Sequence, residues 1–217
     1  MEIPKIIHQI WIGPKNPPKW CMDSWRIDYI KHNPKWTYKL WTEKEINKLQ
    51  IVNRHIYNTE PTLRGKADII RYEILYQYGG IYIDADSLYL DNQLDQLIES
   101  TNNTYFFAGR EPRNKQFVAN GVIGCSPNNK IIYTMIDYLS KNYFDLKHKY
   151  PHKYQIWQVT NQPKFTEICE KNRITIFPSY YFYPEGFIKN NITIPLETIK
   201  NKYKNSFMYQ YWLSHYE

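Results

Sequence analysis

The chain has 217 residues, of which 42% are hydrophobic and 17% aromatic, and this length and composition exclude a disordered chain and predict one compact domain with a single core. Its formal net charge of +7 and pI near 9.1 favour an anionic partner, such as a nucleotide diphosphate, a nucleic acid or an acidic membrane surface. A lysine-rich surface that only keeps the chain in solution explains the same charge equally well.

The first hundred residues alternate between strand and helix patterns. The pattern at 64–78 has apolar residues at helical spacing and is followed by Gly79-Gly80, a pair that terminates helices. Strands and helices in alternation predict an α/β fold with a largely parallel sheet. The elements expected in this half are a strand at 3–13, a helix at 23–32, a strand at 36–41, a short helix from the Thr42–Glu45 capping box to Leu49, a helix at 64–78 and a strand at 81–84.

The second half is rich in Lys, Asn and Tyr and has fewer periodic segments. It contains no repeat and no linker composition, so we expect a single domain over residues 1–217. The elements expected here are strands at 105–108 and 117–124, a helix at 129–141, and strands at 174–177 and 207–212.

Two carboxylates, Asp84 and Asp86, stand at the end of the strand at 81–84. In an extended backbone, side chains two residues apart lie on one face about 7 Å from each other, close enough to serve one hydrated divalent cation. Such a pair also arises by chance, so its position in the fold decides its meaning. Because ligands bind at the carboxyl ends of strands in open α/β sheets, the position favours a ligand site.

A second polar group lies on the helix at 64–78. Arg64, Asp68, Arg71 and Leu75 are spaced four, three and four residues apart and share one face, so Asp68 can contact both arginines. The stripe is either a surface ion-pair ladder of little stability or part of a binding site, and the spacing alone leaves both open.

The segment RGKADIIRY at 64–72, followed by LYQYGGIYIDAD at 75–86, resembles glycosyltransferase family 32. The opening IHQIWIG at 7–13 and NPKWTYKLW at 33–41 match the same family. That family includes yeast outer-chain mannosyltransferases and bacterial capsule and lipooligosaccharide enzymes, and its core resembles the glucosylating domain of large bacterial toxins. The resemblance covers the first hundred residues closely and the rest loosely.

This resemblance implies a GT-A fold, a Rossmann-like and mostly parallel sheet with flanking helices. Residues 1–100 would bind the nucleotide sugar and residues 101–217 would form the acceptor side. The implied activity is a metal-dependent, retaining transfer of a hexose or N-acetylhexosamine from a nucleotide diphosphate sugar to a glycan or other hydroxyl acceptor. A UDP-sugar is the favoured donor and GDP-mannose the next, with Mn²⁺ or Mg²⁺ as cofactor.

The resemblance also implies residue roles. Trp11 would stack on the nucleobase, although a buried strand tryptophan fits the same position. Asp86 would ligate the metal, with Asp84 contacting ribose or sugar. The implied catalytic residues are Asp84, Asp86, Asp68 and Arg71, and the implied nucleotide-sugar-binding residues are Trp11, Arg64, Asp68, Arg71, Tyr82, Asp84 and Asn120. Asn120 fits an ordinary turn before Gly121 equally well.

The C-terminal end departs from the family pattern. Gln210 stands where the family has a His, and His215 replaces the Trp of a Ser-Trp pair. A third metal ligand would therefore be Ser214, His215, Gln210 or a Glu. The departure supports an alternative, a catalytically silent protein of the same fold that binds a nucleotide or sugar without turnover.

Two further expectations concern partner and compartment. A basic nucleic-acid-binding protein is a third function class, but the basic residues are scattered and form no arginine-rich run, so we expect no nucleic-acid partner. Peripheral association with an anionic membrane surface stays open. Three cysteines in no zinc-like spacing, together with the absence of a signal-peptide pattern and of an 18-residue apolar stretch, predict a soluble cytoplasmic protein.

Overall fold

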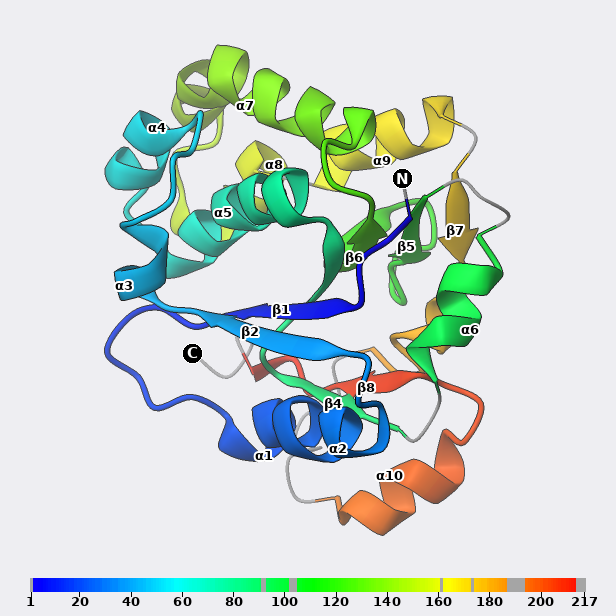
Figure 1. Ribbon diagram of the computed structural model, residues 1–217. Coiled ribbons are helices and arrows are strands. Elements are labelled where there is room, and N and C mark those ends of the chain that lie inside the picture. The colour runs from blue at the N-terminus through cyan, green and yellow to red at the C-terminus, as the bar shows by residue number, and fades with distance from the viewer. Residues whose placement is uncertain are drawn as a thin grey trace.

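The computed structural model describes residues 2–90, 93–101, 105–160, 162–172, 174–186 and 194–213. Its centre is a six-stranded sheet with the strand order β2-β1-β3-β6-β5-β7 (Figure 1). Five of these six strands point the same way and β6 runs against them, which confirms the prediction of a largely parallel α/β sheet. The strands are β1 (Ile6–Ile10), β2 (Thr37–Trp41), β3 (Gly80–Ile83), β5 (Phe106–Arg110), β6 (Val118–Cys125) and β7 (Thr175–Phe177).

Helices cover both faces of the sheet. Successive strand residues point to opposite faces, so Tyr82 joins the core on one face while Ile81 and Ile83 join the core on the other. The first face is covered by α5 (Leu63–Tyr78), α7 (Lys130–Lys149), α8 (Ile156–Thr160) and α9 (Gln162–Lys171) (Figure 1). The second face is covered by α6 (Leu94–Glu99) and by the helical segment at 19–32.

The helical segment at 19–32 contains an unexpected wide turn. It comprises α1 (Lys19–Asp23), a π-helical stretch (Ser24–Tyr29) and α2 (Ile30–His32), so the helix predicted at 23–32 begins four residues earlier, just after Pro17-Pro18. Trp25 and Tyr29 are fully buried in it, and the Trp25 indole donates a hydrogen bond to the Ser87 carbonyl at 3.0 Å. This segment therefore supports the chain just beyond β3.

A two-stranded antiparallel sheet adjoins the main one. It consists of β4 (Ser87–Tyr89), which the sequence did not predict, and β8 (Met208–Gln210), which is shorter than the predicted strand at 207–212. Ser87 pairs with Gln210 across it. The C-terminal segment is thereby held against the residues that follow β3.

The remaining elements are short. The Thr42–Glu45 capping box is present as predicted, but the helix it begins, α3 (Glu43–Ile46), ends before Leu49. Conversely, α7 runs to Lys149, beyond the predicted end at 141. No helix in the described ranges is long and apolar enough to cross a membrane. The helices that periodicity did not predict are α4 (Arg54–Thr59), α6, α8, α9 and α10 (Leu196–Lys202).

Candidate active site

The segment Asp84-Ala85-Asp86 is a turn rather than the extended backbone that the sequence suggested. The amide of Ser87 donates to the Asp84 carbonyl at 3.1 Å and closes the turn directly after β3. The Asp84 amide in turn donates to the Gly121 carbonyl of β6 at 2.9 Å. The two carboxylates are thus set by a turn anchored to the sheet, and not by the alternation of a strand.

Arg71 is the centre of an ion-pair network below Asp84. Its guanidinium lies 2.9 Å from Asp68 Oδ1 and 3.4 Å from Asp84 Oδ1. The side chains of Asp68 and Arg71 are only 3% and 5% exposed, so this pair is not a surface ladder. Burial would lower the pKa of Arg71, but the neighbouring Tyr82, Asp68 and Asp84 raise it, so the guanidinium stays charged.

Asp68 is fixed by three separate elements. Besides Arg71 on its own helix α5, it accepts a hydrogen bond from Asn120 of β6 at 3.1 Å and from the hydroxyl of Thr160 of α8 at 2.6 Å. Arg71 also donates to the Asn120 carbonyl at 2.6 Å. A carboxylate whose two oxygens are both held in this way is pre-organised, so it loses little conformational entropy when a ligand binds.

Tyr82 links the network to Asp84. Its hydroxyl donates to Asp84 Oδ1 at 2.8 Å, and the Arg71 guanidinium lies 4.5 Å from the centre of its ring. Burial raises the pKa of Asp84, partly offset by Arg71. The Asp84 side chain is still 30% exposed, so one side of the carboxylate faces the pocket.

Asp86 is held by the C-terminal segment. Gln210 of β8 donates its amide to one carboxylate oxygen, and the Leu213 backbone N–H donates to the other at 2.8 Å. The amide oxygen of Gln210 accepts from the Ser87 hydroxyl. Burial, and then the charge of Asp84, raise the pKa of Asp86 to about 6. A cation is stabilised beside a buried carboxylate such as Asp86 whose charged form is disfavoured by burial and by a neighbouring negative charge.

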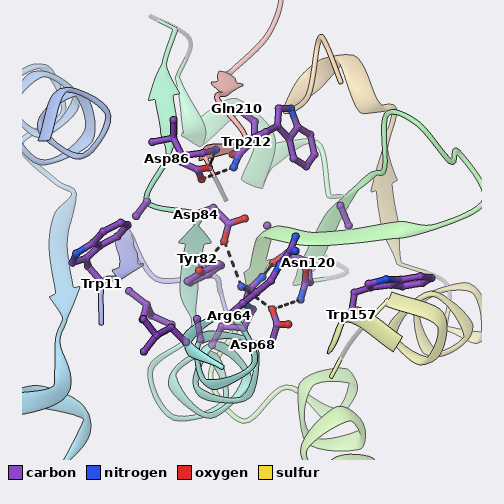
Figure 2. A pocket seen from close by; sticks show the side chains of 18 of the residues that line it. Trp11, Arg64, Asp68, Tyr82, Asp84, Asp86, Asn120, Trp157, Gln210 and Trp212 are labelled. Atoms are coloured by element: carbon purple, nitrogen blue, oxygen red, sulfur yellow. Dashed lines mark hydrogen bonds and ion pairs between the residues drawn. The ribbon is translucent and has the colours of Figure 1, made fainter. Parts of the chain in front are cut away.

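These side chains line one cavity of about 630 Å³, a volume typical of small-molecule sites (Figure 2). It collects all nine described residues that the sequence singled out for the site, which are Trp11, Arg64, Asp68, Arg71, Tyr82, Asp84, Asp86, Asn120 and Gln210. Ser214 and His215 lie outside the described residues.

The surroundings of Trp11 and Arg64 test two of the predictions made from the sequence. Trp11 is half-buried at the end of β1 and borders the cavity, so it is not a core tryptophan. Arg64 is exposed and makes no ion pair with Asp68 in the described part of the chain, so the prediction that Asp68 contacts both arginines is wrong. Arg64 lies one helical turn before Asp68 and lines the cavity instead.

Two polar residues of β1 that were not predicted from the sequence anchor β3 and the turn that follows it. His8 of β1 makes a hydrogen bond from Nε2 to the Gly79 carbonyl at 2.9 Å, and its Nδ1 accepts from the Trp41 indole at 3.1 Å. Gln9 donates to the Asp84 carbonyl at 3.2 Å. Both belong to the IHQIWIG segment, so the motif match contained this signal, but only the fold shows what the two polar residues do.

Fold and site together define a class of protein. A mostly parallel α/β sheet with an aspartate pair after a central strand is the arrangement of GT-A glycosyltransferases, and solved structures confirm this fold. The PaToxG glycosyltransferase superimposes with a TM-score of 0.59 at 20% identity, covering 78% of this chain and 69% of that one. A glycosyltransferase involved in glycosylation of the major capsid of PBCV-1 gives a TM-score of 0.51 at 12% identity over 95% of this chain and 93% of that one.

The sequence match points to a particular family. Residues 20–104 match the model of the glycosyltransferase sugar-binding region containing the DXD motif, and Asp84-Ala85-Asp86 is that motif. The match agrees with the family that the sequence resembled, and the matched region is one described for glycosyltransferases.

Curated relatives agree with the match. Inositol phosphoceramide mannosyltransferase 1 of Schizosaccharomyces pombe is 29% identical over 170 residues, which are 76% of this chain and 50% of the relative. An uncharacterized glycosyltransferase of Acanthamoeba polyphaga mimivirus is 32% identical over 148 residues, 65% of this chain and 56% of the relative. The chain thus spans about half the length of these relatives.

Proposed function

We propose that the chain transfers a hexose from a nucleotide diphosphate sugar to a hydroxyl acceptor, with a divalent cation at Asp84-Ala85-Asp86. The observation that supports this most strongly is the joining of the DXD turn and the Asp68–Arg71–Asn120 network in a single cavity. One part offers carboxylates to a cation, and the other offers fixed, charged hydrogen-bonding groups to a sugar.

The donor sugar is the ligand that fits the Asp68–Arg71 network. Charge-assisted hydrogen bonds from a carboxylate and a guanidinium suit the vicinal hydroxyls of a pyranose. The Nε of Arg71 is buried and has no hydrogen-bond partner among the described residues, as expected where a ligand supplies the missing acceptor. The names of the curated relatives favour mannose, so GDP-mannose stands beside a UDP-hexose or UDP-N-acetylhexosamine as a candidate donor.

The residues of the turn fit a hard divalent cation. Asp86 and Asp84 supply carboxylate oxygens, the ligands that Mn²⁺ and Mg²⁺ prefer. A cation there would offset the burial and the repulsion from Asp84 that together raise the pKa of Asp86. Gln210 can add an amide oxygen if its side chain is reversed, because the amide NH₂ would then donate to the Ser87 hydroxyl. Mn²⁺ or Mg²⁺, when bound, would neutralise charge on the diphosphate leaving group.

The protein's own groups do the positioning. Trp11 offers an aromatic face to a nucleobase, while Arg64, exposed beside the turn, can approach a phosphate. Asp68 and Arg71 fix the sugar so that its anomeric carbon faces the acceptor. In a retaining transfer the acceptor oxygen bonds to that carbon on the face from which the phosphate oxygen leaves, and the acceptor proton passes to the departing phosphate. No side chain is then needed as a nucleophile.

One observation favours a second candidate, a silent nucleotide- or sugar-binding protein. Among the described residues no cluster of three or more His, Cys, Asp and Glu side chains is placed to hold a metal. Within the described residues, which do not include Ser214 and His215, the metal would then depend on two aspartates, on Gln210 and on ligand oxygens. Such a protein would bind the nucleotide but consume no donor.

The test is consumption of UDP-glucose, UDP-N-acetylglucosamine and GDP-mannose by the purified protein, with Mn²⁺, with Mg²⁺ and with EDTA. We expect one donor to be consumed in a metal-dependent way, and Asp86→Asn to lower the rate by about two orders of magnitude or more. Asp137→Asn is the matched control, because Asp137 pairs with Lys141 on the surface of α7. Equal rates for Asp86→Asn and wild type would refute the role of Asp86, and binding without consumption would favour the silent protein.

A further inference from the structure

The cavity has two aromatic ends. Trp11 borders it on one side and Trp157 on the other, with Asp84, Arg64 and Asp68 between them (Figure 2). Trp157 belongs to α8, where Thr160, one helical turn later, bonds to Asp68 at 2.6 Å. The same short helix therefore reaches the donor-sugar network with one residue and the far end of the cavity with another.

Charge is distributed unequally between the two ends. The cationic residues lining the cavity, within the described ranges, are Lys15, Arg64 and Arg71. Lys15 lies with Trp11, whose indole donates to its carbonyl at 2.8 Å, and the two arginines belong to the centre. Glu111 also lines the cavity, and its backbone N–H donates to the carbonyl of Phe117, the residue that packs against Trp157. Among the described residues that line the cavity, the Trp157 end therefore offers no cation to a phosphate or carboxylate.

The groups at the Trp157 end are also free to bind. Trp157 is half-buried, packs against Phe117 with ring centres 6.1 Å apart, and lies with the strongly exposed Tyr154 at the cavity edge. In the described part of the chain, the indole N–H of Trp157 and the amide of Gln162 make no hydrogen bond, although both residues line the cavity. In contrast, the polar groups around Asp84 bond mainly to one another.

The Trp157 end combines an aromatic face with free neutral hydrogen-bonding groups and has no cation among the described residues that line it. This combination suits an uncharged sugar ring. The apolar C–H face of a pyranose stacks on an indole, and its hydroxyls bond to neutral amide and N–H groups. We propose that the Trp157 end is the acceptor subsite and that it binds an uncharged pyranose ring, with Trp157 as its stacking platform and Gln162 as a hydroxyl-binding residue. This rests on the proposed function, because the subsite has meaning only beside a nucleotide-sugar site.

The test measures binding of two neutral probes, methyl α-mannopyranoside and methyl β-glucopyranoside, by saturation-transfer NMR in the presence of GDP or UDP and Mn²⁺. We expect at least one glycoside to bind wild type, Trp157→Ala to weaken it about tenfold or more, and Trp157→Phe to retain part of the affinity. Trp20→Ala is the matched control, because Trp20 is 50% exposed on α1 and does not line the cavity.

Nucleotide binding, measured on the same samples by thermal shift, separates this proposal from the proposed function. If nucleotide binding is unchanged in Trp157→Ala while glycoside binding falls, the acceptor subsite is supported. The proposal is overturned if wild type binds nucleotide but neither glycoside, if Trp157→Ala and Trp20→Ala bind the glycosides alike, or if an anionic probe such as a phosphoserine peptide competes with them. Absence of nucleotide binding in wild type would instead refute the proposed function.

Discussion

At the scale of single residues, Gly121 leaves room for the carboxylate of Asp84. A Cβ built at Gly121 would lie 2.6 Å from Asp84 Oδ2 and 2.8 Å from the hydroxyl of Tyr183, closer than real contacts allow. Asp84 meets Tyr82 and Arg71 on its other side, so it cannot retreat without breaking those contacts. The absence of a side chain at Gly121 therefore sets the position of the first aspartate of the turn.

We expect Gly121→Ala to lower donor consumption by about tenfold or more, because misplacing a positioning group by about 1 Å can cost two orders of magnitude. We expect the free energy of unfolding to change little in this variant. Gly186→Ala is the control, since its nearest contact is the flexible Arg113 side chain at 3.2 Å. Steady-state rates of both variants check this, and a Gly121→Ala enzyme as fast as Gly186→Ala would mean that the position of Asp84 is not critical.

The sequence predicted the residues of this site better than their contacts. Asp68, Arg71, Asp84 and Asp86 could be selected because they stand in segments that resemble glycosyltransferase family 32, whereas their spacing alone left other interpretations open. Contacts between distant segments have no local signal. Nothing in the sequence near Asp86 indicates that Gln210 and Leu213 bind it, because they lie more than 120 positions away and reach it through the β4–β8 pair.

At the scale of elements, α8 connects the helical layer to Asp68. The hydroxyl of Thr160 donates to Asp68 Oδ2 at 2.6 Å and also lies 2.9 Å from the Ile156 carbonyl of its own helix. A second buried threonine, Thr166 of α9, accepts a hydrogen bond from the Val118 amide at 2.9 Å. The two threonines are thus similar in burial and bonding but differ in whether they touch the site.

We expect Thr160→Val and Thr166→Val each to lower the free energy of unfolding by about 1 kcal/mol, the usual cost of one buried hydrogen bond. Only Thr160→Val should also weaken binding of the donor sugar, because Asp68 loses one of its fixed partners. Urea denaturation and titration with the nucleotide sugar, compared with the free nucleotide, measure the two effects. Equal donor affinity in the two variants would limit Thr160 to a structural role.

Strand β1 contributes a buried histidine that makes stability depend on pH. His8 is fully buried, and burial lowers its pKa from 6.5 to about 4, although the hydrogen bond to Gly79 opposes this. The folded protein therefore keeps His8 neutral below pH 6.5, whereas the unfolded chain takes up a proton. Stability from this group is complete above pH 6.5 and is lost as the pH falls to about 4.

Between pH 7 and pH 4, we expect the free energy of unfolding of wild type to fall by roughly 3 kcal/mol more than that of His8→Gln, since one pKa unit corresponds to about 1.4 kcal/mol. The raised pKa values of Asp84 and Asp86 act in the opposite direction but affect both proteins alike. Urea unfolding at several pH values measures the difference. If the two proteins keep a constant difference in stability over this range, His8 does not titrate as described.

The elements that the sequence predicted are those with strong local patterns. The helix at 64–78 has long apolar periodicity and a glycine stop, and it appears as α5 with Gly79 and Gly80 at positive φ. Helices such as α8, with five residues, are too short to show a period, and β4, with three, gains its strand conformation only by pairing with β8. These short elements therefore depend on tertiary contacts and have no local signal of their own.

At the scale of the whole molecule, residues of both halves of the chain meet in one cavity. Among the described residues, the cations that line it lie at the Trp11 end and the centre. We expect residues 1–100 to bind the nucleotide sugar and residues 101–217 to form the acceptor side, and this division stays a prediction. The two parts do not form separate sites, because Asn120 and Gln210 of the second part contact Asp68 and Asp86 of the first.

The central claim is that this cavity binds a nucleotide diphosphate together with a divalent cation. The most direct test is the thermal unfolding midpoint of the protein with UDP, GDP, UMP, CMP and their sugar conjugates, each with and without Mn²⁺. A ligand at 100 times its dissociation constant stabilises a protein by about 2.7 kcal/mol, which corresponds to roughly 5 to 11 °C for a domain of this size. We predict such a shift for one nucleoside diphosphate, or its sugar conjugate, only when Mn²⁺ is present. No shift with any of these ligands, or the same shift in EDTA, would contradict the account.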